Sequence, residues 1–497
     1  MPFTCTFGLP LLLKYRPPLK ALLVLKPVSF SIFALRLNFL SIAICRMYSF
    51  KNTVITISYF SESKKLMSFD KLLQQSLIWR GFYFATSLLL NIVLSRFLQA
   101  EGSGFVYYLA NFFSLILLIA SVSMESGFTY FASGKIIQSD KLAVFGIIWI
   151  VLISVVLILF FRFWFNHFES ESSLDQFTYC QYAIFFIAGV LLNNFYTALF
   201  QAEQNFFLPN FLLGSMNMIF IIILVLEKWN GYSIHTLTDS FFYFILINGI
   251  VIAISYFIKN KILLSFSWMG YKEFKILFQY SLLALFTNVI FFLVYRIDFW
   301  FVKYNCSAAD LGNYIQASKI GQLILVIPQV LASAVFPQIA SRKLQADVSS
   351  VIIKLFRIFI QFFSVLFIFV FLTGHWLFIF VFGQSFDKMQ QPLMILLPGI
   401  LCLSALSLLS AYFGGKGDLK VNMKGAVYGL MVVVAGNVLL LKYYTIEIAA
   451  IVSSAGYIVN FAYSYRNFAK IGELKPDEFR KWTISDWLWL KRMLFNK

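Results

Sequence analysis

Residues 291–319 read FFLVYRIDFWFVKYNCSAADLGNYIQASK. The stretch starts as an apolar and aromatic run that contains Arg296 and Asp298, turns at a loop with Gly312, and continues into a segment that carries Lys319. Ionised side chains within an apolar run are costly unless they face a bundle interior or a water-filled cavity. The stretch therefore predicts two membrane-spanning helices joined by a short loop, with charged side chains facing a cavity.

The whole chain has the composition of a polytopic membrane protein. Of its 497 residues, 60% are hydrophobic and 12% are charged, whereas soluble domains carry about 25% charged residues. Repeated apolar stretches of roughly 20 residues are long enough to cross a bilayer. A soluble chain of this composition would have no water-facing surface left, so we expect an all-α integral membrane protein.

The cysteines and histidines do not predict a cofactor. The 5 cysteines and 3 histidines lie far apart, and no CxxC pair occurs. An odd, scattered set is poor support for a disulfide framework or a metal site. We therefore expect no zinc, haem or iron–sulfur centre.

From residue 76 onward the hydropathy pattern predicts twelve membrane spans. Their approximate bounds are 76–98, 105–131, 142–165, 179–202, 208–226, 241–258, 276–302, 312–340, 357–382, 391–413, 421–441 and 446–465. Lysine and arginine then concentrate in the loops on the side of both termini, which places both termini in the cytoplasm. The net charge of +18 thus reflects membrane topology, and we expect no nucleic-acid partner.

The twelve spans divide into two sets of six, which predicts two lobes, residues 67–262 and 263–466, around a central cavity. LQAEGSGFVYYLAN (98–111) and CSAADLGNYIQASK (306–319) both run alanine, acid, spacer, glycine, aromatic. This likeness favours an internal repeat. Because both halves would begin in the cytoplasm, the repeat would be of the parallel type, with its axis along the membrane normal.

The two ends of the chain are predicted separately. Residues 1–66 are basic, and they are either a signal peptide, whose apolar core would be interrupted by Arg36, or an extension upstream of a start at Met67. We favour the second interpretation. Residues 467–497 form a cytoplasmic tail, in which ISDWLWLKRMLFNK (484–497) predicts an amphipathic helix at the membrane interface, or else a frayed end.

Polar side chains on four spans, two from each half, mark the walls of the expected cavity. Residues three, four or seven apart share a helix face, and polar residues within the membrane normally face a bundle interior. The candidate substrate-binding residues are Arg80, Asn91, Asn111, Glu125, Asn288, Arg296, Asp298, Lys319 and Gln322.

The charged members of this set fall at two depths. Arg80 and Glu125 lie near the cytoplasmic ends of their spans, where they could pair. Arg296 and Lys319 lie near the external ends, with Asp298 slightly further out, so that this site is net positive and favours an anionic cargo. The alternative is that charges close to a span end reach the interface and that Asp298 only partners a neighbouring cation.

The same segments resemble a known family. YRIDFWFVKYNCSAADLGNYIQASKIGQLILVIPQVLASAVFPQIAS (295–341) is similar to the seventh and eighth spans of Wzx-type polysaccharide or O-antigen repeat-unit flippases, which belong to the multidrug/oligosaccharidyl-lipid/polysaccharide (MOP) exporter superfamily. The matching positions are Arg296, Asp298, Asp310, Gly312, Tyr314, Phe336 and Pro337. FVFGQSFDKMQQPLMILLPGILCLSAL (380–406) and LNIVLSRFLQAEGSGFVYY (90–108) resemble two further segments, and the likeness covers about residues 70–465.

The resemblance implies twelve helices in two six-helix lobes around a cationic cavity. It implies transport of undecaprenyl-diphosphate-linked oligosaccharide from the inner to the outer leaflet of the bacterial inner membrane, beside a polysaccharide polymerase and chain-length machinery. Glu101, Gly102, Gly104 and the N-terminal segment depart from the commonest pattern of the family. The identity of the sugar is left open.

The residues predict a mechanism that agrees with this resemblance. Fixed cations in a low-dielectric cavity offset the desolvation of phosphate groups. We expect Arg80 to take the diphosphate in the inward-open state and Arg296 and Lys319 to receive it as the lobes rock. Coupling to Na⁺ or H⁺ through Glu125 or Asp298 is left open.

Two other functions are weighed against this one. A cation-coupled drug antiporter of the multidrug and toxin extrusion (MATE) type would need a cavity acid free to exchange a cation, whereas the acids here sit beside bases. A membrane enzyme such as a glycosyltransferase or polymerase would need a large external loop, and none is predicted. We therefore expect a transporter and no enzymatic activity.

Overall fold

A computed structural model of the chain describes residues 69–168, 175–262, 267–326, 328–329, 347–416, 418–472 and 486. Regular structure in these residues is entirely helical. Ten of the described helical segments are long and apolar enough to cross a membrane. The prediction of an all-α membrane protein is therefore confirmed.

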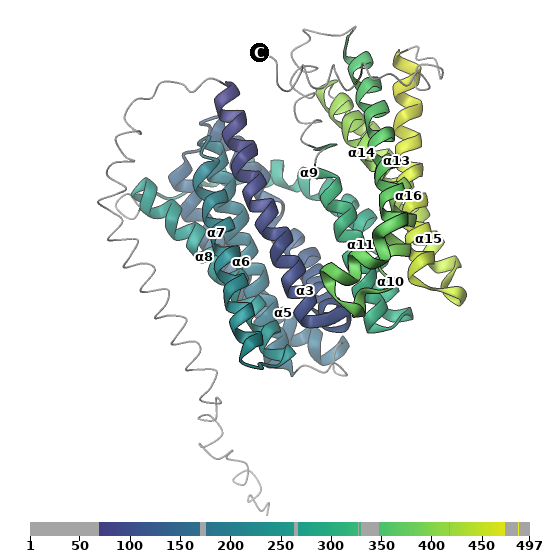
Figure 1. Ribbon diagram of the computed structural model, residues 1–497. Coiled ribbons are helices and arrows are strands. Elements are labelled where there is room, and N and C mark those ends of the chain that lie inside the picture. Colours follow the sequence, from purple (N-terminus) through teal and green to yellow (C-terminus); the bar gives the residue numbers. More distant parts are fainter. Residues whose placement is uncertain are drawn as a thin grey trace, which may run out of the picture. The chain divides into compact units, whose positions relative to one another are not determined.

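Figure 1 shows the described helices coloured along the chain. The first half forms α3 (Phe69–Ser121), α4 (Met124–Ser133), α5 (Ser139–Phe168), α6 (Gln176–Ala202), α7 (Phe207–Trp229) and α8 (Ile234–Asn260). The second half forms α9 (Tyr271–Arg296), α10 (Asp298–Asn305), α11 (Ala308–Ile324), α13 (Asp347–Phe382), η3 (Gln384–Phe386), α14 (Gln390–Lys416), α15 (Leu419–Leu439), η4 (Leu441–Tyr443) and α16 (Ile446–Gly472).

The ten observed spans and the twelve predicted ones differ at two places. The first and second predicted spans are continuous in α3, which bends at Gln99 (φ 61°, ψ −179°) without a loop between the two parts. The eighth predicted span begins as α11, which is described for 17 residues. Most of the remainder of that span lies outside the described residues.

Some sequence-based predictions cannot be compared with the structure. The extension at residues 1–66, the Phe336–Pro337 pair and the interfacial helix at 484–497, apart from Asp486, lie outside the described residues. The lobe boundary at residues 262–263 stays a prediction.

Two hydrophobic cores hold the described helices together. One core is built from residues between Leu109 and Leu277, and the other mainly from residues between Val294 and Phe468. The second core also takes in side chains from Leu90 to Tyr108, around the bend of α3. This packing brings the bend of α3 against α11 and thereby positions the candidate site.

Candidate functional site

The segment that follows the bend of α3 packs directly on the start of α11. A Cβ atom added at Gly312 would lie 1.9 Å from the carbonyl oxygen of Ala100, and one added at Gly104 would lie 2.8 Å from the carbonyl oxygen of Ala308. Both distances are below the 3.0 Å that real Cβ atoms keep, so the backbones approach this closely only because both residues are glycine. The packing is reciprocal, since each glycine meets the alanine four residues before the other. We call these four residues the glycine contact.

The segment around η3, in the second half of the chain, stabilises the glycine contact by hydrogen bonds and an ion pair. The backbone amide of Ala100 donates to Ser385 Oγ at 3.1 Å, and Asn313 Nδ2 donates to the Ser385 carbonyl at 3.0 Å. Lys388 Nζ lies 2.8 Å from Asp310 Oδ1. These bonds hold α3, α11 and η3 together at one end of the site.

Lys319 lies two turns further along α11 and is bound by α3. Its Nζ donates to Asn91 Oδ1 at 2.9 Å and lies 2.8 Å from the ring centroid of Tyr107, a cation–π arrangement. Asn91 Nδ2 donates to Gln316 Oε1 at 2.9 Å, and Gln316 Nε2 donates to Ser95 Oγ at 2.6 Å. The network thus joins the first part of α3 to α11 by side chains that are all neutral except Lys319.

Arg296 reaches the same face of α11 from the end of α9. Its Nη2 donates to Gln322 Oε1 at 2.6 Å, and its Cζ lies 5.3 Å from the ring centroid of Phe299. Gln322 follows Lys319 by three residues and therefore lies on the same face of α11. We call Arg296, Lys319, Asn91 and Gln322 the cation site. Each of its two cations is hydrogen-bonded to a neutral amide.

Asp298 is hydrogen-bonded to side chains outside the cation site. Its Oδ2 accepts hydrogen bonds from the Tyr314 hydroxyl at 2.5 Å and from Ser453 Oγ at 2.7 Å. Its Oδ1 has no hydrogen-bond partner, although the side chain is buried. Among the described residues, neither Arg296 nor Lys319 has a carboxylate within ion-pair distance.

Two further candidates, Asn288 and Glu125, lie around the start of α4. Val122 and Ser123 both have positive φ angles, 50° and 54°, which separate α3 from α4. Asn288 Nδ2, on α9, donates to Ser123 Oγ at 3.1 Å. Glu125 follows in the first turn of α4, and its Oε2 has no hydrogen-bond partner.

Arg80 and Asn111 are separate from the cation site. The Cζ atom of Arg80 lies 5.3 Å from the ring centroid of Phe206. In the part of the chain that the structure describes, Arg80 and Glu125 form no ion pair, so the expected pairing is absent. Asn111 is buried on α3, and its Nδ2 has no partner.

Several side chains of this region were not among the residues predicted from the sequence. Gln316 precedes Lys319 by three residues, and the same helical spacing that selected Gln322 could have selected it. Ser453 lies on α16, a span in which no polar face was recognised. Tyr107 carried no signal, because an aromatic residue in a membrane helix is most often simply packed against apolar neighbours.

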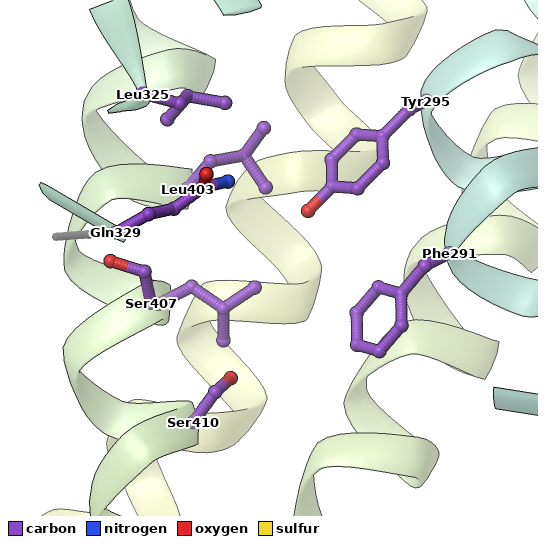
Figure 2. A pocket seen from close by; sticks show the side chains of 8 residues that line it. Phe291, Tyr295, Leu325, Gln329, Leu403, Ser407 and Ser410 are labelled. Carbon is purple, nitrogen blue, oxygen red and sulfur yellow. The ribbon is translucent and has the colours of Figure 1, made fainter. Parts of the chain in front are cut away.

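A pocket of about 170 Å³ lies beyond the cation site, between α9, α14 and the continuation of α11. Figure 2 shows Phe291 and Tyr295 pointing from α9 toward Ser407 and Ser410 of α14. We call it the aromatic pocket. It is lined by Phe291, Tyr295, Leu325, Gln329, Leu403, Leu406, Ser407 and Ser410.

Comparison with known proteins identifies this helical arrangement. No protein-family model and no curated protein matches the sequence. Lipid II flippase MurJ, in its inward closed conformation, matches with a TM-score of 0.62 and 16% identity over 84% of this chain and 91% of that one. An inward-facing multidrug resistance MATE family transporter of the MOP superfamily matches with a TM-score of 0.61 and 13% identity over 80% and 99%.

A third structure agrees. The Vibrio cholerae MATE transporter VcmN, in its bent form, matches with a TM-score of 0.53 and 15% identity over 86% of this chain and 99% of that one. The chain has the MOP-superfamily fold. Because the identities are low, the MOP fold alone does not define the cargo, which we infer from the site.

Proposed function

We propose that this chain is a flippase for undecaprenyl-diphosphate-linked polysaccharide repeat units of the Wzx type, and that it moves them from the inner to the outer leaflet of the bacterial inner membrane. The observation that carries the proposal is the cation site. Arg296 and Lys319 converge there on one face of α11, and both are bonded to neutral amides. A lipid diphosphate needs such a site, because its charges cannot otherwise enter a low-dielectric cavity.

The two cations suit a diphosphate in different ways. The planar guanidinium of Arg296 matches two phosphate oxygens, whereas the ammonium of Lys319 acts as a compact point charge. Phosphate oxygens are stronger acceptors for both cations than the amide oxygens of Gln322 and Asn91. The cargo can therefore replace these amides at Arg296 and Lys319 after a first encounter with Arg80.

The glycine contact supports an arrangement of two six-helix lobes related by a parallel repeat. It joins the two segments whose sequences are alike, and its reciprocity is what a pseudo-twofold axis between them would produce. The lysine and arginine distribution assigns this contact to the external side of the membrane. Opening it while the opposite end closes would be the alternating-access step, as in other transporters built from repeats.

The proposal also includes the ion that drives transport and the proteins that receive the cargo. Asp298 and Glu125 each have a carboxylate oxygen without a hydrogen-bond partner, and they are the candidates for H⁺ or Na⁺ coupling. A polysaccharide polymerase and the chain-length machinery would take the delivered repeat unit. Drug antiport by exchange against a cavity acid is the alternative, and Glu125 would be its acid, because Glu125 forms no ion pair with Arg80 within the described residues.

The proposal is tested by Arg296→Ala and Lys319→Ala in a strain that lacks its own repeat-unit flippase. Each substitution removes a charge-assisted contact to phosphate, worth about 1.5–3 kcal/mol, or roughly 10-fold to 150-fold in affinity. We expect surface polysaccharide to be lost while the protein is still expressed. Lys303→Ala is the matched control, since Lys303 is an exposed cation beyond Arg296. Full complementation by both variants at normal expression would contradict the proposal.

A further inference from the structure

The aromatic pocket has two chemically different walls. Phe291 and Tyr295 form one wall, with ring centroids 6.3 Å apart and planes within 15° of each other. Polar groups of Gln329, Ser407 and Ser410 lie opposite or beside them among leucine side chains. Such a lining combines flat apolar surface with a few convergent polar groups, as binding sites for small organic molecules do.

Several of these polar groups are free to bind a ligand. No hydrogen bond within the described residues engages the Tyr295 hydroxyl, the Gln329 amide or the Ser410 hydroxyl. Ser407 Oγ donates to the Ser404 carbonyl at 2.7 Å and can still accept. An acyl chain in this pocket would leave these groups unsatisfied against hydrocarbon, which is unfavourable. Among the described residues that line the pocket there is no cation, so this lining does not suit a phosphate either.

The pocket and the cation site are built on neighbouring residues of the same two helical segments. Tyr295 directly precedes Arg296 in α9, and Gln322, Leu325 and Gln329 are spaced three and four residues apart, on one face of the α11 helix and its continuation. The backbone bond from Gln329 to Leu325, 3.1 Å long, keeps this helical geometry past the end of α11. Gln329 lies seven residues beyond Gln322, which corresponds to about 10 Å along the axis. A group covalently attached to a diphosphate at the cation site can therefore reach the pocket.

The size of the pocket limits what fits. Its volume of about 170 Å³ is smaller than the roughly 300 Å³ at which pockets for drug-sized ligands begin. One sugar ring fits, and a whole oligosaccharide does not. A pyranose also matches the two walls, because its C–H face packs on aromatic rings while its hydroxyls bond to amide and hydroxyl groups.

We propose that the aromatic pocket is the subsite for the first sugar of the lipid-linked cargo, the ring that is attached to the diphosphate. This inference rests on the proposed function, since the diphosphate at the cation site is what delivers the sugar to Tyr295 and Gln329. The pocket then selects cargo that carries at least one sugar over the bare lipid carrier.

The test measures binding of defined lipids to the purified full-length protein by native mass spectrometry. The probes are undecaprenyl diphosphate and the same lipid bearing one glucose, galactose or N-acetylglucosamine. We expect at least one sugar-bearing lipid to bind more tightly than the bare lipid. Tyr295→Phe and Gln329→Ala should each reduce that preference roughly five-fold, as expected for one lost hydrogen bond, and leave binding of the bare lipid unchanged.

Control variants make the result specific. Ser404→Ala alters a buried hydroxyl on the same helix as Ser407 but outside the pocket, so it should change neither affinity. Arg296→Ala should weaken both lipids equally. Leu406→Trp should fill the pocket and abolish only the sugar preference.

Each of the other outcomes contradicts the proposed sugar subsite, and each leads to a different conclusion. Equal binding of bare and sugar-bearing lipids by the unsubstituted protein, or an unchanged preference in Tyr295→Phe and Gln329→Ala, excludes the subsite and leaves the proposed function standing. A loss of bare-lipid binding in Leu406→Trp would mean that the pocket holds the lipid chain. No binding of any diphosphate lipid would remove the proposed function itself, and the subsite with it.

Discussion

The glycine contact and the aromatic pocket lie on opposite sides of the cation site along α11, and they differ in the size of the side chains that meet. At the glycine contact the backbones touch and a single Cβ atom has no room. At the pocket, rings and leucine side chains stand apart around about 170 Å³ of space. Along α11, the glycine contact comes first, the two cations follow, and the aromatic pocket comes last. We call the glycine contact the closed end and the aromatic pocket the hollow end. Small residues allow the backbones to pack together at one end of α11, whereas large side chains at the other end leave a pocket between the helices.

The largest effect is expected for Gly312→Val, which places a branched side chain where the backbones of α3 and α11 touch. The added Cβ would overlap the Ala100 carbonyl oxygen, so α3 and α11 cannot pack as they do. We expect transport to be lost. We also expect a single cysteine introduced by Ala100→Cys, in a background without the native cysteines, to react at least 10-fold faster with a membrane-impermeant maleimide.

The matched control for this variant is Gly81→Val on the same helix α3, where no heavy atom lies within 4 Å of the position of an added Cβ. That variant should leave both transport and labelling unchanged. Slow labelling in Gly312→Val with retained transport would show that the glycine contact is not a closed gate.

A smaller effect on labelling is expected at Asn91, and its direction should differ between two substitutions. Asn91→Ala removes the amide that holds Lys319 and Gln316 to α3, so labelling at Ala100→Cys should rise several-fold, as expected for a lost bond to a charged group. Asn91→Asp places an anion beside Lys319 instead. Labelling should then fall, and so should affinity for undecaprenyl diphosphate, because the new carboxylate competes with phosphate for Lys319.

Asn467→Ala serves as the control for both Asn91 variants, since the Asn467 amide bonds only to a carbonyl within its own helix. If Asn91→Ala and Asn91→Asp shift labelling in the same direction, the charge of Lys319 does not stabilise the packing of α3 on α11.

The membrane class was predicted correctly from the sequence, whereas the way in which the candidate residues group could not be predicted from it. Arg296, Lys319, Gln322 and Asn91 were selected by helical spacing, and the structure brings them together. Spacing along one helix does not show which other helix faces it, so the pairing of Asn91 with Lys319, some 230 positions away, could not be read from it. For the same reason, the hydrogen bond between Asp298 and Ser453, which lies on a distant span, could not be predicted from the sequence.

The bend of α3 was expected as a loop between two spans. Gln99 instead makes the turn with one residue at positive φ, an adjustment of backbone geometry that no hydropathy pattern reveals. The aromatic pocket was not predicted for a related reason, because Phe291 and Tyr295 look like ordinary residues of a membrane helix until the facing serines are located.

The smallest effect concerns the Asp310–Lys388 pair at the entrance to the closed end. Burial opposes ionisation of Asp310, but the hydrogen bond and the charge of Lys388, together with Ser307, outweigh it and lower the pKa of this carboxyl below its ordinary value. A lowered carboxyl pKa contributes stability above the ordinary value of about 3.9 and loses it as the pH falls through the lowered value. The pair should therefore hold unchanged from pH 8 to about 5 and weaken only in more acidic solution.

The magnitude of this contribution is limited by solvent, because 59% of the Lys388 side chain is exposed. Such pairs contribute about 0–1 kcal/mol. We expect Asp310→Asn to lower the unfolding temperature slightly at pH 7 and to have no effect once the pH lies well below the lowered pKa of Asp310, where this carboxyl is neutral, as measured by tryptophan fluorescence on heating. Glu101→Gln removes an exposed carboxylate from the facing segment of α3 and should change neither value. An equal loss at both pH values would mean that Asp310 stabilises the closed end through its hydrogen bonds to Ser307 and not through its charge.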